Sequence, residues 1–222
     1  KYFEEKFKKL FLQNHSYNFF DISEIENVNS VFENQNLAGI NVTIPYKQAV
    51  IPFLDELSDE AKEIGAVNCI SFQNGKKTGY NTDAFGFEKT LLINKKEHHK
   101  KALILGDGGA AKAVRYILEK HNIAHQTVSR KSEVNFENLS EDLVKDSLLI
   151  IQTTPVGTFP NVDDSVSFPF DAITDKHYVI DLIYNPSETA FLRKSAEKGA
   201  TTLNGFYMLE QQAEKAWAIW KS

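Results

Sequence analysis

The sequence predicts an α/β protein of two domains, and three observations support this prediction. From residue 101 onward, short apolar runs alternate with segments of helical periodicity, which predicts a parallel sheet with crossover helices. A glycine-rich turn separates the first of these runs from the helix that follows it. Before residue 83, short runs are joined through turn signals instead, so the first third is expected to belong to a separate domain.

The composition excludes several classes of protein. The 222 residues suit one large or two small domains, and the 42% hydrophobic and 25% charged content is typical of a soluble globular protein. A net charge of -5 argues against a nucleic-acid partner, and no apolar run approaches the roughly 20 residues that span a bilayer. The single cysteine, Cys69, excludes an intramolecular disulfide and favours the cytoplasm. The chain does not open like a signal peptide, and its histidines lack metal-site spacing, so no metal is expected.

In the first third, the expected elements are short. An amphipathic helix opens the chain, with Phe3, Phe7, Leu10 and Phe11 on one face. Residues 17–20 and 38–44 read as strands, the second one ended by Pro45, and residues 46–54 as a short helix. Two further strands, 66–72 and 77–80, are joined through a turn at Asn74-Gly75, and a helix begins at residues 81–83.

The remainder of the chain alternates between strand and helix. The predicted strands are 102–105, 125–128, 148–151, 178–182 and 201–203. A helix over 187–198 has a serine cap at its start and Gly199 after its end, and a last helix covers 205–220. We therefore place a nucleotide domain at residues 83–204. Residues 1–82 and 205–222 form the second, discontinuous domain.

The glycine turn follows the pattern G-x-G-x-x-A, with strand before it and helix after it. Its residues are Gly106-Asp107-Gly108-Gly109-Ala110-Ala111. In a Rossmann-type domain, Gly106 allows the sharp turn, Gly108 allows close approach of a pyrophosphate, and Ala111 allows helix and strand to pack closely. The helix N-terminus adds free N–H groups for phosphate. An ordinary glycine turn is the alternative interpretation.

A polar row precedes Pro45. Asn41 and Thr43 alternate with apolar residues and are expected to point the same way, with Lys47 just beyond the strand end. Such a row suits a ligand rich in hydroxyl groups. Taken by itself, however, the segment is better explained as an amphipathic strand with a surface lysine.

Several ordered motifs resemble the shikimate dehydrogenase family. They are Asn41-Val42-Thr43-Ile44-Pro45-Tyr46-Lys47, Gly65-Ala66-Val67-Asn68, Gly79-Tyr80-Asn81-Thr82-Asp83-Ala84-Phe85-Gly86, the glycine turn, Asp181-Leu182-Ile183-Tyr184-Asn185-Pro186, and the segment from Gly205 to Ala213. The resemblance runs from the opening helix to the C-terminus. It implies a cytoplasmic enzyme of chorismate and aromatic amino-acid biosynthesis that reduces 3-dehydroshikimate to shikimate with NADPH. The partners implied are small molecules only, and both monomer and homodimer stay open.

By the same resemblance, Lys47 and Asp83 form the catalytic pair. Hydride delivery to a ketone builds negative charge on its oxygen, which a nearby ammonium can stabilise or protonate. A carboxylate can hold that ammonium and a substrate hydroxyl in place. The substrate-binding positions implied by the family motifs are Asn41, Thr43, Lys47, Asn68, Asp83, Tyr184 and Gln212. Gln212 is preferred to its neighbour Gln211 because it directly precedes Ala213, and a half-buried aromatic at a strand end is the alternative for Tyr184.

The cofactor implied is NADP. An NAD enzyme often carries a carboxylate at the end of the second strand, whereas a cation there favours a 2′-phosphate. This chain has Ser129, Arg130 and Lys131 at that place, with Glu133 two residues further on. The remaining cofactor-binding positions implied are Thr153 and Gly205, in addition to the turn residues Gly106, Gly108, Gly109, Ala110 and Ala111. An NAD-dependent quinate/shikimate dehydrogenase and a non-catalytic sensor of nucleotide and polyol acid are the alternatives.

The chain departs from the family pattern at two places. The family has a first strand and a Ser-x-Ser segment before the opening helix, whereas this sequence begins with Lys1 in the helix. We therefore expect residues before Lys1, because the missing strand would leave an exposed sheet edge. Gln152 also stands where the family usually has asparagine.

Overall fold

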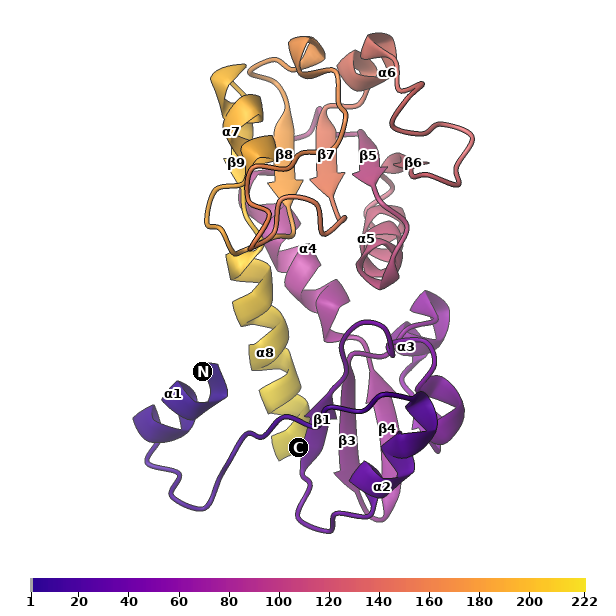
Figure 1. The fold of residues 1–222 in the computed structure, drawn as a ribbon, viewed down its shortest axis with the longest axis vertical. Coiled ribbons are helices and arrows are strands. Elements are labelled where there is room, and N and C mark those ends of the chain that lie inside the picture. The colour runs from indigo at the N-terminus through magenta and orange to yellow at the C-terminus, as the bar shows by residue number, and fades with distance from the viewer. Residues whose placement is uncertain (1) are drawn as a thin grey trace. The chain divides into compact units, whose positions relative to one another are not determined.

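The computed structural model describes residues 2–222, and the chain divides into two compact units, Lys1–Leu37 and Ala38–Ser222. Figure 1 shows the helices and strands of both. Among residues 2–222, no helix has the length and apolar character that spanning a bilayer requires. The α/β class predicted from the sequence is confirmed.

The first unit consists of short helices. Helix α1 (Tyr2–Lys9) buries Phe3 and Phe7 as predicted, but it ends before Leu10 and Phe11. Phe11 has a left-handed backbone with φ of 56° and is 88% exposed, so these two residues do not extend the apolar face. The 3₁₀ helix η1 (Ile25–Asn27) and helix α2 (Val28–Phe32) complete the unit.

The strand predicted at residues 17–20 is wrong. Its backbone adopts no regular structure, and Phe19 is 88% exposed. A strand is defined by hydrogen bonds to a neighbouring strand, and the described residues of the first unit contain no other strand.

A four-stranded sheet opens the second unit, in the order β1-β3-β4-β2. Strands β3 (Cys69–Gln73) and β4 (Lys76–Tyr80) pair antiparallel through a tight turn in which Asn74 and Gly75 both have positive φ, which confirms the predicted hairpin. Residues 66–68, predicted as strand, precede β3. The other strands are β1 (Gly39–Asn41) and β2 (Glu56–Leu57).

Between β1 and β3, two predictions are wrong and two elements were not predicted. The strand expected over 38–44 ends at Asn41, and residues 46–54 form turns and the 3₁₀ helix η2 (Ile51–Phe53) in place of an α-helix. Pro52 explains the second result, because proline inside an α-helix removes a hydrogen bond and clashes with the preceding turn. The elements that were not predicted are strand β2 and helix α3 (Asp59–Ile64), which is capped by the Ser58 side chain.

A five-stranded sheet follows in the order β6-β5-β7-β8-β9, and every neighbouring pair is parallel, as predicted. The strands are β5 (Lys101–Leu105), β6 (Ala124–Val128), β7 (Leu149–Gln152), β8 (Tyr178–Asp181) and β9 (Thr201–Leu203). Alternate residues of β5 enter different cores. Ala102 and Ile104 pack with residues of α4 (Thr82–Asn94) and α5 (Gly109–Lys120). Leu103 and Leu105 pack with residues of α6 (Glu141–Asp146) and α7 (Ala190–Glu197). Helices therefore cover both faces.

The helices beside this sheet are α5 (Gly109–Lys120), α6 (Glu141–Asp146) and α7 (Ala190–Glu197), with a 3₁₀ turn, η3, at Phe170–Ala172. Helix α7 begins later than predicted. The side chain of Thr189 caps it by accepting from Leu192 N, whereas Ser187 lies before the helix and its carbonyl accepts from Asn204.

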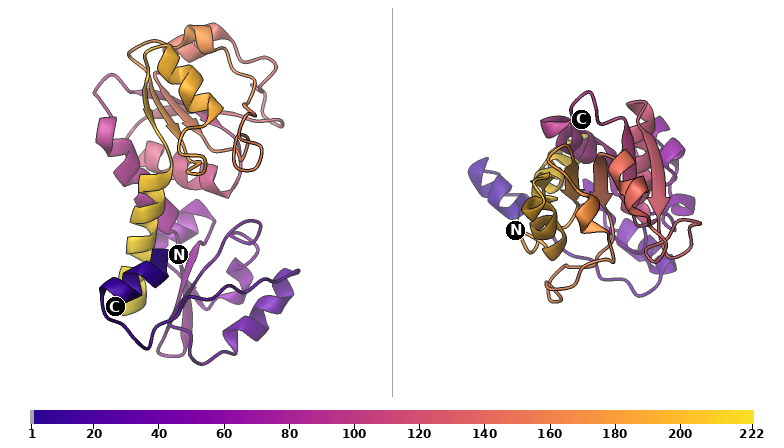
Figure 2. Two further views of the ribbon diagram at one scale, coloured as in Figure 1. Left: turned by 60° about the vertical axis from the view of Figure 1, so that its left-hand side comes forward. Right: turned by 90° about the horizontal axis from the view of Figure 1, so that it is seen from above.

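Helices α4 (Thr82–Asn94) and α8 (Phe206–Lys221) connect the two sheets of the second unit (Figures 1 and 2). They pack so closely that a Cβ on Gly86 would lie 2.6 Å from the Met208 carbonyl oxygen. At the far end of α8, the indole of Trp220 donates to Ile70 O of β3 at 3.0 Å. The chain's last helix therefore returns to its first sheet. The domain boundaries at residues 82/83 and 204/205 stay a prediction.

Candidate active site

The carboxyl ends of the parallel strands bring the predicted cofactor positions to one edge of the five-stranded sheet. The glycine turn follows β5, Arg130 follows β6, and Thr153 follows β7. The strand order reverses between β5 and β7, and open α/β sheets bind ligands at such a point. Thr153 ties the two strands together there, since both its N–H and its hydroxyl donate to Leu105 O at 2.9 Å.

Two glycines of the turn have different requirements. Gly106 has φ of 115°, and a Cβ on it would lie 2.6 Å from the Thr153 hydroxyl oxygen, so a side chain is excluded. A Cβ on Gly108 would have no atom within 4 Å. The backbone at Gly108 is thus open to a ligand, at the start of α5, where free N–H groups attract anions. The residues present fit a dinucleotide.

The segment after β6 presents two cations. Arg130 and Lys131 are exposed, while Ser129 is buried and its hydroxyl lies 2.7 Å from that of Ser132. Because Ser129 also accepts from the Lys131 N–H at 3.3 Å, it shapes the turn from inside. Glu133 is exposed on the same segment.

Lys47 and Asp83, predicted as a catalytic pair, are in contact. Lys47 Nζ lies 2.5 Å from Asp83 Oδ2, and the two side chains are 17% and 10% exposed. The other carboxylate oxygen, Oδ1, accepts from the Asn68 side-chain amide at 2.9 Å. Both oxygens of Asp83 are therefore engaged in holding a defined geometry.

Asn68 is the centre of this cluster. Its amide nitrogen also donates to the Thr82 hydroxyl at 3.0 Å, and its oxygen accepts from the Thr82 backbone N–H at 2.6 Å. Gln212 on α8 joins from the other side, with Oε1 at 3.3 Å from the Thr82 hydroxyl. Sequence reasoning assigned no role to Thr82, although it stands inside the Asn81-Thr82-Asp83 motif, which was the available signal.

Local folding sets these positions. Asn81 caps α4 by accepting from Ala84 N at 3.1 Å, and its amide donates to Ala66 O at 2.9 Å. Asp83 consequently sits in the first turn of α4, where a carboxylate is favoured. The backbone of Lys47 is held by Val67, whose N–H donates to Lys47 O at 2.7 Å.

The structure also brings Lys47 beside the glycine turn. A Cβ built on Gly109 would lie 3.5 Å from Lys47 Cδ. Nearby, Lys112 Nζ of α5 donates to Gln48 Oε1 at 3.0 Å. The Lys47–Asp83 pair and the candidate nucleotide site are therefore neighbours, which sequence spacing could not show.

Three predicted substrate positions are less tightly defined. Asn41 ends β1 and is half-buried, whereas Thr43 is exposed and lies beyond the strand, so the premise that both alternate along one strand is wrong. Tyr184 follows β8 and is 50% exposed.

Gly205, a predicted cofactor position, is the N-cap residue of α8, and a Cβ on it would lie 2.0 Å from Leu182 O. Glycine is therefore required at position 205 because any side chain would clash with the backbone of Leu182.

Gln152, the departure noted from the sequence, has a structural role. Its side chain is fully buried, and both the nitrogen and the oxygen of its amide group form hydrogen bonds with the backbone of the loop that follows β7. The amide donates to Val156 O at 3.3 Å, and the oxygen accepts from Thr154 N at 2.8 Å. Gln152 thereby fixes the loop that carries Thr153.

Asp181 and Cys69 are among the buried groups whose pKa is shifted. Burial raises the pKa of Asp181 to about 6, partly offset by hydrogen bonds from the Thr189 hydroxyl at 2.6 Å and Ile183 N at 3.0 Å. Burial also raises the pKa of the Cys69 thiol to about 12. Cys69 is therefore a protonated core residue at neutral pH.

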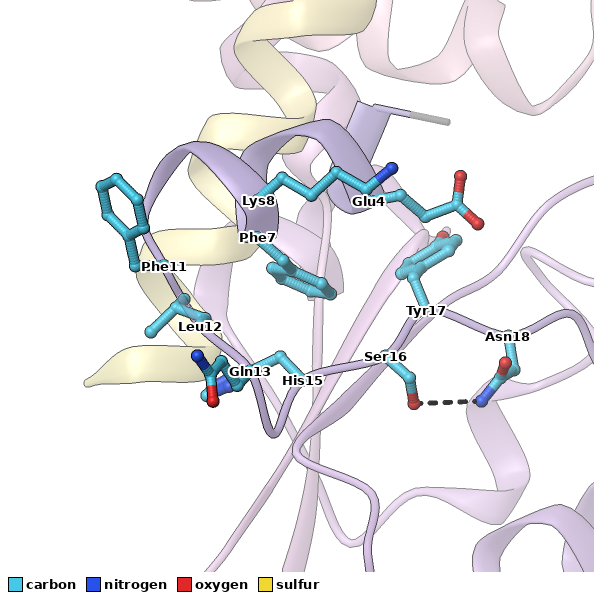
Figure 3. Close-up of a pocket in the computed structure, with 10 residues that line it drawn as sticks. All are labelled: Glu4, Phe7, Lys8, Phe11, Leu12, Gln13, His15, Ser16, Tyr17 and Asn18. Atoms are coloured by element: carbon cyan, nitrogen blue, oxygen red, sulfur yellow. Dashed lines mark hydrogen bonds between the residues drawn. The ribbon is translucent and has the colours of Figure 1, made fainter.

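A separate hollow of about 500 Å³ lies within the first unit (Figure 3). It is lined by Glu4, Phe7, Lys8, Phe11, Leu12, Gln13, His15, Ser16, Tyr17 and Asn18. None of the predicted site residues lines it.

Comparison with known proteins identifies the family. The family model described as the shikimate dehydrogenase substrate binding domain matches residues 1–70. The NADP(+) shikimate dehydrogenase of Desulforamulus reducens is 38% identical over 208 residues, covering 83% of this chain and 72% of the relative. The chain belongs to the shikimate dehydrogenase family.

Solved structures of this family have the same fold. A shikimate dehydrogenase in complex with NADP+ superimposes with a TM-score of 0.85 at 33% identity, covering 98% of this chain and 83% of the other. The shikimate dehydrogenase of Aquifex aeolicus gives a TM-score of 0.84 at 37% identity, covering 98% and 85%.

Proposed function

We propose that this chain catalyses the reversible reduction of 3-dehydroshikimate to shikimate with NADPH, a step in aromatic biosynthesis. One observation supports this most directly. The buried Lys47–Asp83 pair lies beside the glycine turn, with Lys47 Cδ 3.5 Å from the position of a Cβ on Gly109. Reduction of a ketone adds a hydride to the carbonyl carbon and a proton to the carbonyl oxygen. The nucleotide site and the proton donor therefore have to be neighbours.

When bound, NADPH supplies the hydride. The chain's own residues handle charge and protons. Lys47 stabilises the negative charge that develops on the substrate oxygen and protonates it, and in the reverse direction it assists removal of the hydroxyl proton. Asp83 holds the Lys47 ammonium through Oδ2, and Asn68 fixes Asp83 through Oδ1. Low exposure of both charged groups strengthens their electrostatic effect.

Substrate recognition is proposed for the polar side chains around this pair. These are Asn41, Thr43, Asn68, Tyr184 and Gln212, together with Lys47 and Asp83 themselves. The contact between Gln212 and Thr82 supports the choice of Gln212 over Gln211. Hydroxyl groups of a polyol acid suit the amide, hydroxyl and carboxylate groups gathered here.

For the cofactor, we propose that the residues Gly106, Gly108, Gly109, Ala110 and Ala111 hold the diphosphate. Arg130 and Lys131 are proposed for the 2′-phosphate, because both are exposed cations just after the carboxyl end of β6, the second strand of the parallel sheet along the chain. Ser129 shapes their turn, and Thr153 and Gly205 border the same edge of the sheet.

An absorbance assay of the reduced nicotinamide tests this function. Purified protein is incubated with NADP or NAD, and with shikimate, quinate or no substrate. We expect the fastest reduction with shikimate and NADP. Faster reduction with quinate and NAD would instead assign the chain to quinate oxidation, and binding of NADP without turnover of either acid would indicate a sensor.

We further propose that the protein acts in the cytoplasm, as a monomer or a homodimer, on small molecules alone. The buried free thiol of Cys69 and the net charge of -5 support this setting. Sedimentation of the purified protein distinguishes the two oligomeric states.

A further inference from the structure

Asp107 places a carboxylate within the glycine turn. It lies between Gly106 and Gly108, directly before α5, and its side chain is 53% exposed. Phosphates and carboxylates are attracted by the same positive end of a helix dipole. An uncompensated carboxylate at this place would therefore repel the diphosphate that the turn is proposed to bind.

Arg115 compensates this charge. It lies further along α5, and its Nη1 donates to Asp107 Oδ1 at 2.8 Å. The same nitrogen is 3.4 Å from the hydroxyl of Thr127, the penultimate residue of β6. The Arg115 side chain is 25% exposed, so it is partly sheltered from solvent, and it connects the glycine turn to the strand that leads to Arg130.

We propose that Arg115 is a positioning residue for NADP, neutralising Asp107 and fixing its carboxylate against β6. This inference rests on the proposed function. Arginine suits the role because its charge is permanent and its Nη1 carries two N–H donors, one for each acceptor. Lys112 on the same helix is bonded to Gln48 instead, and Arg130 and Lys131 belong to the segment after β6. Arg115 thus acts on the turn rather than on the phosphate.

The test is a double-mutant cycle read by calorimetric titration with NADP. The variants are Arg115→Gln, Asp107→Asn and the two together. Lys120→Gln is the matched control, because it removes one positive charge from the last turn of α5, where Lys120 pairs with Glu88. Thermal unfolding of each variant reports any loss of fold.

We expect Arg115→Gln to weaken NADP binding about tenfold, since a like charge close to a diphosphate is then unscreened. Asp107→Asn should bind NADP at least as tightly as the parent. The double variant should return to within about threefold of the parent, because the charge that needed compensation has gone. Lys120→Gln should bind like the parent.

Three outcomes overturn the inference while the proposed function stands. They are parent-like binding by Arg115→Gln, a double variant as weak as Arg115→Gln, and a tenfold loss in Asp107→Asn. The second would show that Arg115 itself touches the nucleotide, and the third that Asp107 does. The Asp107→Asn result decides the matter even if Arg115→Gln fails to fold. A parent that binds no NADP would overturn the proposed function together with this inference.

Discussion

The cluster around Asp83 and the turn between β5 and α5 are two parts of one candidate site, yet they are built in opposite ways. Around Asp83, the groups are buried or largely buried side chains that hydrogen-bond to one another, and both carboxylate oxygens take part. At the turn, a ligand would meet backbone N–H groups, open space beside Gly108 and exposed cations such as Arg130. The first arrangement is fixed before a ligand arrives.

This difference predicts where substitutions act. Changes in the Asp83 cluster should alter the rate of the chemical step, because its geometry is tuned to the transition state. Changes at the turn should alter nucleotide affinity and leave the fold intact. The following variants test that separation, from the largest expected effect to the smallest.

Lys47→Met should lower kcat roughly a hundredfold or more, the usual scale for a positioned acid–base group, with a much smaller change in KM for shikimate. Methionine keeps much of the length and removes the ammonium. Steady-state kinetics at saturating NADP measure both constants. Lys62→Met, which removes an exposed lysine paired with Asp59, is the control and should keep kcat. A kcat within a few-fold of the parent with a steep rise in KM would make Lys47 a binding residue.

Gly108→Ala should weaken NADP binding roughly thirtyfold, because the methyl group would enter the space proposed for the diphosphate. Stability should stay equal or rise slightly, since the backbone at Gly108 (φ of -88°) suits alanine and no atom lies within 4 Å of the new Cβ. Fluorescence titration and thermal unfolding measure the two effects. Unchanged affinity would place the diphosphate elsewhere. Gly106→Ala serves as the contrast and should lose stability as well.

Arg130→Ala should weaken NADP binding roughly tenfold and leave NAD binding nearly unchanged. The 2′-phosphate loses a charge-assisted hydrogen bond that NAD does not make. Titration of both nucleotides gives the ratio. Lys145→Ala, an exposed lysine of α6, is the matched control. Equal losses for both nucleotides would show that Arg130 does not recognise the 2′-phosphate.

Asp181→Asn should change the pH dependence of stability. Since burial raises the pKa of Asp181 from 3.8 to about 6, the folded state holds a proton more tightly than the unfolded state. Ionisation of Asp181 therefore destabilises the folded protein. This effect is absent below about pH 4, grows as the pH rises, and is complete above about pH 6. Asparagine removes it but loses the acceptor for the Thr189 hydroxyl, leaving a net gain on the order of 1 kcal/mol at pH 7.

The measurement is the difference in melting temperature between Asp181→Asn and the parent from pH 4 to pH 8. The difference should grow in favour of the variant between about pH 4 and pH 6. A constant difference across this range would mean that Asp181 ionises normally in the folded protein. Asp171→Asn is the control: the pKa of this exposed carboxylate is lowered from 3.8, so its contribution changes mainly below about pH 4 and the difference from the parent should stay nearly constant from pH 4 to pH 8.

The sequence by itself determined the elements that depend on local patterns. The parallel strands, the hairpin at Asn74-Gly75, the start of α4 and the glycine turn follow from apolar periodicity and from residues with special backbone or capping properties. These signals act over a few residues, so they can be read along the chain. The same approach failed at residues 17–20, because apolar and aromatic side chains alone do not provide a pairing partner.

Only the tertiary structure decided which residues that are distant in the sequence lie close together in space. Lys47 and Asp83 are far apart in the chain. The closeness of Lys47 to Gly109 and the contact of Arg115 with Asp107 depend on how helices and strands pack. The sequence also suggested that Thr43 continues the row of Asn41, whereas β1 ends at Asn41. Distances between side chains are set by the packing of whole elements, which is cooperative and nonlocal, and so they are not encoded in any short stretch.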